Sequence, residues 1–236
     1  MKTYLPYFIL PVSIVCLLST SSCKRDYYTA PDYLTQQTAN HKLIAIVPAE
    51  MVFTGKQPQN LLPEDIAALE EKESMAFQES LLNGILRYAN TRNYYMAVSV
   101  QDINTTRQLL KKNNISVRAS WTWDERELAS LLGVDAIVRM RIQKKRYMSD
   151  AASYSIGVGK QILGAIGNAS RVSIPYIPTK TNDIYASCNL ISDGLTLWND
   201  NYKAASDYNS PANIIIENIT DNFGENFPYK KKRKYR

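Results

Sequence analysis

The sequence predicts an α/β fold in which a single mixed β-sheet of about five strands is flanked by helices. Apolar runs rich in β-branched residues alternate along the chain with segments that carry an apolar stripe at helical spacing. In addition, the dipeptide Asp193-Gly194 lies between two partly alternating apolar runs, which is a strong signal for a β-hairpin. This order of elements is typical of a mixed sheet domain with two or three layers.

The first predicted strand and helix lie at the start of the folded region. Residues 42–49 (KLIAIVPA) are a nearly continuous apolar run stopped by Pro48, which predicts a strand buried on both faces. Residues 51–70 predict a loop with a short helix after Pro63, and residues 73–91 predict a longer helix. The apolar stripe of that helix consists of Phe77, Leu81, Leu82, Ile85, Leu86 and Ala89.

A second strand and helix come next. Residues 94–101 (YYMAVSVQ) predict a strand because β-branched and aromatic residues are frequent in them. Asp102 is expected to cap a helix over residues 103–112, because an aspartate side chain accepts hydrogen bonds from the first free N–H groups of a helix.

The clearest local signal surrounds the next helix. Asp124 and Glu127 have the spacing of a capping box, and Gly133 lies where a helix commonly ends in a left-handed glycine. These residues predict a short helix over 125–132. It leads into residues 134–143, whose partial alternation predicts a strand with one face in the core.

The last third of the chain begins with a segment of different composition. Residues 150–178 are rich in glycine and nearly free of charge, and we expect a surface insertion with a short amphipathic helix. The predicted hairpin strands follow at 183–192 and 195–204. Ser210-Pro211 predicts the start of a final helix, in which Gly224 is expected to be a weak point. The apolar stripe of this helix consists of Ile215, Ile219, Phe223 and Phe227.

The N-terminus has the pattern of a secretory signal. A short basic start precedes an apolar stretch over residues 4–18, and small residues lead to Cys23. We interpret residues 1–22 as a lipoprotein signal peptide and Cys23 as the lipidated first residue of the mature chain. A cleaved ordinary signal and a retained anchor are the alternatives. Residues 23–41 are polar and predict a flexible tether between the membrane and the domain.

Charge and cysteine content limit the functions of the domain, which we place at residues 42–228. The formal net charge is +6, but six positive charges lie in the last seven residues, so the rest of the chain is nearly neutral. Nucleic acid is therefore not expected as a partner. Residues 229–236 predict a basic disordered tail, with binding to anionic phospholipid or to an acidic partner as the alternative. Cys188 is expected to be a small buried side chain.

Sequence signals for catalysis or for a cofactor are weak. The single histidine, His41, does not suffice for a multi-histidine metal site, and no nucleophile motif of the G-x-S-x-G type occurs. Gly157-Val158-Gly159-Lys160 lacks the spacing of a phosphate-binding loop. We therefore predict no catalytic residue, no metal and no cofactor. Acidic clusters at Glu64–Glu73 and Asp124–Glu127 leave a carboxylate-dependent hydrolase as an alternative.

Three short motifs resemble a known lipoprotein family. They are KLIAIVPA at 42–49, ELASLLGVDAIVRMRI at 127–142 and LISDGLTLWNDNY at 190–202. Behind a relaxed lipobox of the Bacteroidota type, they resemble the CsgG/LpoB-like family, which has a TolB N-terminal-like fold. The hairpin turn is shorter here than in the family pattern, since Asp193 and Gly194 are adjacent.

The resemblance implies a non-catalytic role in the cell envelope. Members act at the periplasmic face of the outer membrane, either as partner-binding activators or as self-assembling secretion-channel subunits. We expect a lipid-anchored factor that binds an envelope protein, with a self-oligomer as the alternative. Tyr94, Tyr95 and Trp121 are candidates for an exposed partner-binding surface, although packing in the core is the simpler role for aromatic side chains.

Overall fold

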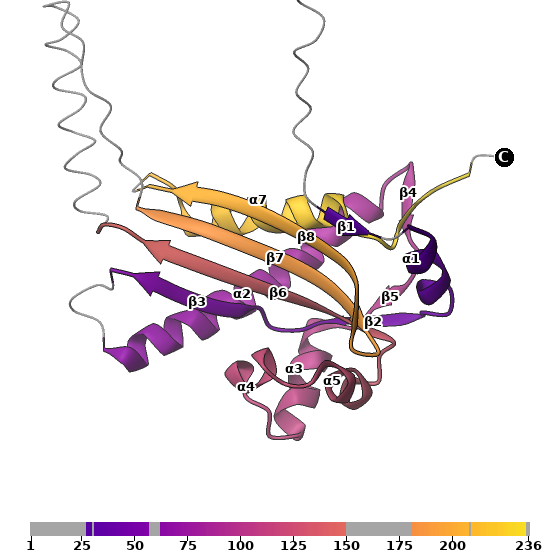
Figure 1. Cartoon of the computed structure of the whole chain (residues 1–236), viewed down its shortest axis with the longest axis horizontal. Helices are drawn as coiled ribbons and strands as arrows, with labels where there is room; N and C mark the ends of the chain where they lie inside the picture. The colour runs from indigo at the N-terminus through magenta and orange to yellow at the C-terminus, as the bar shows by residue number, and fades with distance from the viewer. Residues whose placement is uncertain (1–26, 30, 57–61, 150–180, 208, 235–236) are drawn as a thin grey trace, which may run out of the picture.

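The structure is a computed structural model that describes residues 27–29, 31–56, 62–149, 181–207 and 209–234 (Figure 1). The predicted signal peptide, Cys23 and the glycine-rich insertion at 150–178 lie outside the described residues. The elements in chain order are β1 (Tyr27–Thr29), α1 (Pro31–Thr38), β2 (Leu43–Ile46), β3 (Glu50–Gly55), α2 (Pro63–Ala89), β4 (Tyr94–Met96), β5 (Ser99–Val100), α3 (Ile103–Lys112), α4 (Val117–Trp121), α5 (Glu125–Leu132), β6 (Ala136–Arg146), β7 (Asn182–Ser192), β8 (Leu195–Ser206), α7 (Ala212–Glu225) and β9 (Lys230–Lys232).

The predicted mixed α/β class is confirmed. In the described residues the main sheet has seven strands, in the order β1-β8-β7-β6-β2-β5, with β3 also paired to β6. Strands β2 and β3 follow one another along the same edge of β6 and run parallel to it. Strands β6, β7, β8 and β1 form antiparallel pairs. The three long strands β6, β7 and β8 are therefore the rigid centre of the sheet.

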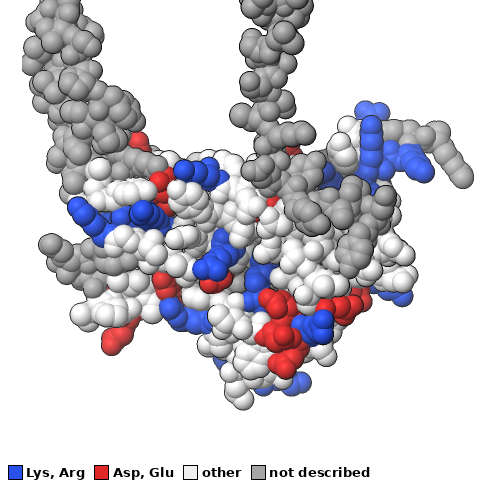
Figure 2. All heavy atoms as spheres, in the orientation of Figure 1, with Lys and Arg blue, Asp and Glu red and all other residues white. Residues whose placement is uncertain are grey.

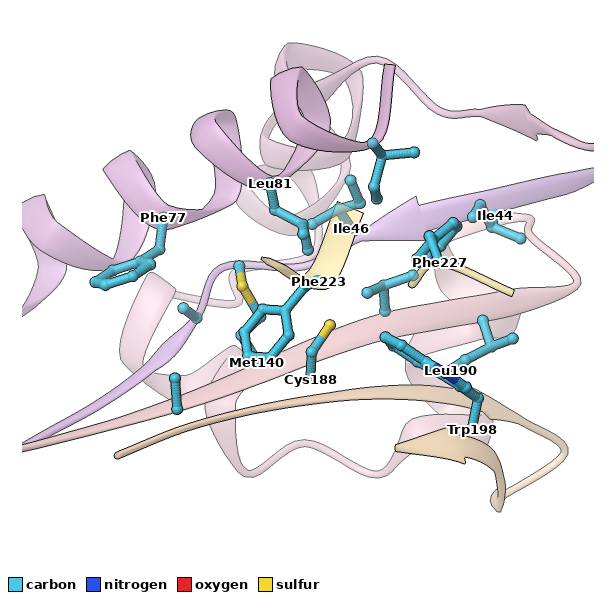
Figure 3. Close-up of a cluster of buried hydrophobic side chains, with 14 of the residues drawn as sticks. Ile44, Ile46, Phe77, Leu81, Met140, Cys188, Leu190, Trp198, Phe223 and Phe227 are labelled. Carbon is cyan, nitrogen blue, oxygen red and sulfur yellow. The ribbon is translucent and has the colours of Figure 1, made fainter. Parts of the chain in front are cut away.

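Helices α2 and α7 cover one full face of the sheet (Figure 1). Figure 3 shows side chains from both helices packed against alternating residues of the strands, including Met140, Cys188 and Leu190. Cys188 is fully buried, as predicted, and burial raises the pKa of its thiol well above the usual value. The thiol is thus held in its neutral form as part of the core.

The opposite face is covered only at one end. There, α3 and α5 pack Leu110, Leu128 and Leu132 against Ile137 and Ile191 of the sheet. Figure 1 shows these helices together with α4 below one end of the strands. The remaining length of β6, β7 and β8 has no described helix on this face.

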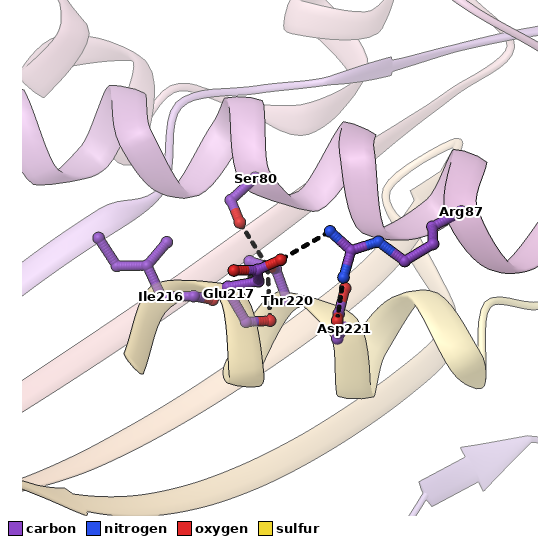
Figure 4. A network of polar contacts seen from close by, with 6 residues as sticks. All are labelled: Ser80, Arg87, Ile216, Glu217, Thr220 and Asp221. Carbon is purple, nitrogen blue, oxygen red and sulfur yellow. Dashed lines mark hydrogen bonds and ion pairs between the residues drawn. The ribbon is translucent and has the colours of Figure 1, made fainter. Parts of the chain in front are cut away.

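Two glycines allow α2 and α7 to lie unusually close together. A Cβ atom on Gly224 would meet the main-chain carbon of Gly84 at 2.5 Å. Hydrogen bonds flank this contact: Ser80 and Thr220 share one of 2.7 Å, and Arg87 donates to both Glu217 and Asp221 (Figure 4). The prediction that Gly224 is a weak point is therefore wrong, because the absence of a side chain at this position permits the two helices to meet.

The predicted caps at Asp102, Asp124 and Gly133 and the predicted hairpin turn are confirmed, whereas the N-cap of α7 is Pro211, one residue later than predicted, and it makes no side-chain cap hydrogen bond. The Asp102 carboxylate accepts a hydrogen bond from Thr105 N–H, and that of Asp124 accepts from Arg126 and Glu127. The helix after Asp124 ends at Gly133 with φ +68°. Asp193 and Gly194 both have positive φ, as a two-residue hairpin turn of type I′ requires.

Several boundaries differ from the prediction. The helix after Pro63 continues without interruption to Ala89, so the expected short and long helices are one. Part of the preceding predicted loop forms β3. The single strand predicted over 94–101 is divided between β4, which leaves the main sheet, and β5. Helix α4 was not predicted, because five residues carry too little periodicity to be recognised.

The tether and the tail differ most from expectation. Strand β1, which falls within the predicted tether, pairs with β8 through Tyr27–Thr29, and Leu34 of α1 reaches the core. The predicted disordered tail forms β9, paired with β4, and Tyr229 is buried. In the described residues, no helix combines the length and apolar character needed to cross a membrane.

Candidate functional site

The candidate site is the uncovered half of the second sheet face, which we call the open face. Successive residues of a strand point to opposite sides of a sheet, so one set of alternate side chains lies here while the other set packs under α2 and α7. The open face consists of Arg141, Gln143 and Lys145 of β6, Tyr185, Ser187 and Asn189 of β7, and Asn199, Asn201 and Lys203 of β8.

The register brings these side chains together in rows. Gln143 pairs with Tyr185, which in turn pairs with Lys203. In the next row, Arg141 pairs with Ser187 and Ser187 with Asn201. Most of these side chains line an open hollow of about 420 Å³. Because the three strands hold one another in place, the positions of these groups are fixed by the fold.

An aromatic and cationic pair lies in the middle of the open face. The Lys203 ammonium group is 4.9 Å from the centre of the Tyr185 ring. A side-chain hydrogen bond with Tyr185 and the nearby Asp183 carboxylate raise the pKa of Lys203, so it stays cationic. Tyr185 is 42% exposed.

Amide side chains form a ladder beside this pair. Asn199 donates a hydrogen bond to the side chain of Asn189, and Asn201 donates to Asn199 at 2.6 Å. The asparagines of this ladder have further amide donors and acceptors beyond those that they use within it. The open face therefore offers hydrogen-bonding groups to a partner.

The described charges of the open face are mainly positive. Arg141 is 61% exposed and lies 3.6 Å from Glu50, whose side chain is much less accessible. Asp183 is buried and accepts a hydrogen bond from Tyr147 at 2.7 Å. In Figure 2, Lys and Arg side chains are distributed over the strands, whereas acidic side chains gather mostly near α5. The face is thus suited to acidic groups of a partner.

Several carboxylates of the acidic clusters are engaged in structural contacts. Glu70 forms a 2.6 Å ion pair with Arg118 and accepts a hydrogen bond from Phe53 N–H. Glu73 forms a 3.0 Å ion pair with Lys144. No group of three or more His, Cys, Asp or Glu side chains that could hold a metal occurs in the described part of the chain.

A polar cluster around His41 was not predicted from the sequence. Its ring nitrogens lie 2.5 Å from the Tyr229 hydroxyl and 3.3 Å from the Ser192 hydroxyl. Ser192 donates its own proton to the main-chain carbonyl of Asp135 at 2.8 Å, so the hydroxyl is not directed to His41 as an activated nucleophile would be. The cluster ties the hairpin and the C-terminal segment to the start of β2.

The residues of the predicted aromatic surface do not lie together in the structure. Trp121 is buried, donates a hydrogen bond to Ser74 and lies under the Arg118 guanidinium. Its prediction as a partner-binding residue is therefore wrong, because the ring is needed between α4 and α2. Tyr94 and Tyr95 lie on β4, where Tyr94 is half-buried and Tyr95 is 41% exposed.

Comparisons with known proteins do not assign a family. No family model matches the chain, and no curated protein matches it significantly. Among solved structures, lipoprotein GNA1162 from Neisseria meningitidis aligns with a TM-score of 0.41 and 11% identity, over 77% of this chain and 94% of that chain. The PelC dodecamer from Paraburkholderia phytofirmans gives 0.34 and 6%, over 78% and 85%. The LpoB C-terminal domain from Salmonella enterica gives 0.32 and 9%, over 76% and 96%.

Proposed function

We propose that this chain is a lipid-anchored, non-catalytic envelope protein that binds a protein partner through the open face of its sheet. The observation that carries the proposal is the asymmetry of the sheet, since one face is sealed by α2 and α7 and the other presents a rigid polar surface. In agreement with the sequence resemblance, we place the protein at the periplasmic side of the outer membrane, in envelope assembly or secretion.

The anchor is supported by the sequence and by the position of β1. Cys23 follows an apolar stretch and small residues, as lipidation requires. Four residues further on, Tyr27 already belongs to β1. Four residues span at most about 14 Å, so a lipid on Cys23 would hold the domain directly at the membrane. The predicted long tether is thereby replaced by a short attachment.

The chemistry of the open face determines which partner we propose. Arg141, Lys145 and Lys203 supply positive charge, and the amide ladder supplies hydrogen bonds. Exposed charges of this kind contribute more to orientation and specificity than to affinity. We therefore propose a partner segment that presents Asp and Glu side chains among polar residues.

A photocrosslinking experiment in the native cell tests the proposal. A photoreactive amino acid replaces Gln143 on the open face or, as the matched control, the exposed Asn218 on α7. We expect a discrete crosslinked product only from position 143. The charge reversals Arg141→Glu and Lys203→Glu together should reduce that product by about tenfold or more, since each introduces repulsion as well as removing attraction.

Two results would contradict the proposal. One is the same product from both positions, and the other is a product that survives the double charge reversal. Labelling of Cys23 with a radioactive fatty acid tests the anchor separately. The Cys23→Ala variant should lose the label and leave the membrane fraction when cells are broken in high salt, which screens contacts between charged side chains and lipid.

One observation favours self-assembly as a second candidate. Strand β1 pairs only with residues 198–200 of β8, so no described strand pairs with the outer edge of residues 201–206. Unpaired strand edges are templates for pairing with another chain. Size-exclusion chromatography of the lipid-free mature chain distinguishes a monomer from a ring of many subunits.

A further inference from the structure

The C-terminal residues form a fixed basic structure, which we call the basic ribbon: β4, β9, Arg233 and Lys234. The register pairs Tyr94 with Lys232, Tyr95 with Lys231 and Met96 with Lys230. Main-chain hydrogen bonds continue the ladder at both ends, from Ala97 to Tyr229 at 2.9 Å and from Arg233 to Asn93 at 2.8 Å. The positive charges predicted for a disordered tail are therefore held in place.

Aromatic rings fix two of the cationic side chains of the basic ribbon. The Lys230 ammonium lies 5.0 Å from the centre of the Tyr94 ring and 5.8 Å from that of Tyr88. The Arg233 guanidinium lies 5.7 Å from the centre of the Tyr95 ring. Such contacts stabilise cations without neutralising them, so the charge remains available to an external anion.

The basic ribbon displays its charge to solvent. Residues 230–234 are five consecutive cations, of which the last four are exposed. Among the described residues, no acidic side chain forms an ion pair with any of those four. In contrast, basic side chains elsewhere, such as Arg118 and Lys144, are paired with glutamates. The ribbon is thus the strongest uncompensated charge in the described chain.

A chain of contacts connects the basic ribbon to the point where the predicted anchor enters the domain. Asp200 of β8 pairs with Tyr27 of β1. The Asp200 carboxylate also accepts a 3.0 Å hydrogen bond from Asn226, which precedes Lys230 by four residues in the chain. Phe227 packs against both Trp198 of β8 and Tyr229. Figure 1 shows β1, β4 and the C-terminal end on the same side of the molecule.

We propose that the basic ribbon is a second membrane contact, which binds the anionic headgroups of a phospholipid surface beside the lipid anchor. The inference rests on the proposed anchor at Cys23, which brings β1 to within about 14 Å of the lipid. The basic ribbon lies on the same side of the molecule as β1 (Figure 1), and near the headgroups each Lys or Arg contributes about a fivefold gain in binding. The exposed Tyr95 ring suits the membrane interface. This continuity with the anchor favours lipid over an acidic protein as the occupant.

Vesicle sedimentation tests the basic ribbon without the anchor. The mature chain from residue 23, carrying Cys23→Ala, contains every described residue. It is mixed with phosphatidylcholine vesicles that contain about one third phosphatidylglycerol, or with vesicles of phosphatidylcholine alone. We expect binding only to the anionic vesicles, and a steep decrease of that binding with added salt.

Two double variants test whether the vesicle binding occurs at the basic ribbon. Lys231→Gln with Lys232→Gln removes two exposed charges while keeping the main-chain ladder, and should weaken vesicle binding by about 25-fold. Lys111→Gln with Lys112→Gln removes two exposed charges from the end of α3 and should change it less than about twofold. Circular dichroism and thermal melting confirm that both variants are folded.

The possible outcomes separate this proposal from its alternatives and from the proposed anchor. No binding of the parent chain to anionic vesicles overturns the ribbon proposal, as does equal loss in both double variants. Binding to purified acidic protein with none to vesicles would assign the ribbon to a protein partner instead. Fatty-acid labelling of Cys23 is independent of these readouts, so an unlabelled cysteine contradicts the anchor and leaves the vesicle result standing.

Discussion

The two halves of the second sheet face differ in what covers them, although the same strands build both. Along β6, residues 136–140 are all buried, and from residue 141 onward buried and more exposed positions alternate. Ile137 and Gln143 project from the same strand to the same side. Ile137 is fully buried under α5, whereas Gln143 lies open to solvent.

Arg139 lies at the boundary between the halves. Its guanidinium donates hydrogen bonds to the main-chain carbonyls of Trp121 and Trp123, which fixes the end of α4 and the start of α5 on the sheet. Burial lowers the pKa of Arg139, and the Glu125 carboxylate opposes that shift. On this face, the first half of β6 packs against helices and the second half is exposed to solvent, and the buried Arg139 lies between the two halves.

The largest expected difference between the halves is in stability. Ile137→Ala should lower the free energy of unfolding by about 2 to 5 kcal/mol, because it leaves a cavity between the sheet and α5. Gln143→Ala should change it by less than about 0.5 kcal/mol, since the side chain is exposed. Urea denaturation followed by circular dichroism measures both. Similar losses for the two variants would mean that something covers the open half as well.

The contact between α2 and α7 on the fully covered face gives a second test, with a smaller expected effect on stability. Gly224→Ala should destabilise the protein by about 1 to 3 kcal/mol, even though alanine is the better helix former, because the new methyl group meets the main chain of Gly84. Asn218→Ala on the exposed side of α7 should be neutral or slightly stabilising. If Gly224→Ala proved stabilising in thermal melts, the close approach of α2 and α7 would be wrong.

Much of this organisation could be predicted where the signal is local. The capping aspartates, Gly133 and the Asp-Gly turn act within a few residues, and all lie where the sequence placed them. The strand predicted over 134–143 was expected to bury one face only. The structure buries both faces over residues 136–140, including the charged Arg139, which the alternation in the sequence does not indicate.

The remaining features depend on partners far away in the chain. Nothing in residues 27–29 shows that β8 has a free edge to receive them. Similarly, Lys230–Lys232 is typical of a solvated tail until β4 is known to leave the main sheet and pair with it. The candidate site was missed for the same reason, since Arg141, Tyr185 and Lys203 become neighbours only through the register of three strands.

The smallest predicted effect concerns the contacts of His41 at the covered end. Burial lowers the pKa of His41 from its usual 6.5, with Asp135 and Asp193 opposing the shift. A folded-state pKa below the unfolded one means that protonation favours unfolding, so this stability is present above about pH 6.5 and is lost as pH decreases. Because the side chain is only partly buried, the loss between about pH 7.5 and about pH 5.5 should be less than about 1 kcal/mol.

A variant assigns this dependence to His41. His41→Gln keeps a neutral hydrogen-bonding group toward Tyr229 and should flatten the pH dependence over that range. The Asp135 carboxylate, whose pKa is lowered by hydrogen bonds from Leu43 and Lys42 N–H, loses its contribution only below its usual 3.8 and does not interfere. Urea denaturation at the two pH values measures both proteins. An unchanged pH dependence in His41→Gln would show that another group is responsible.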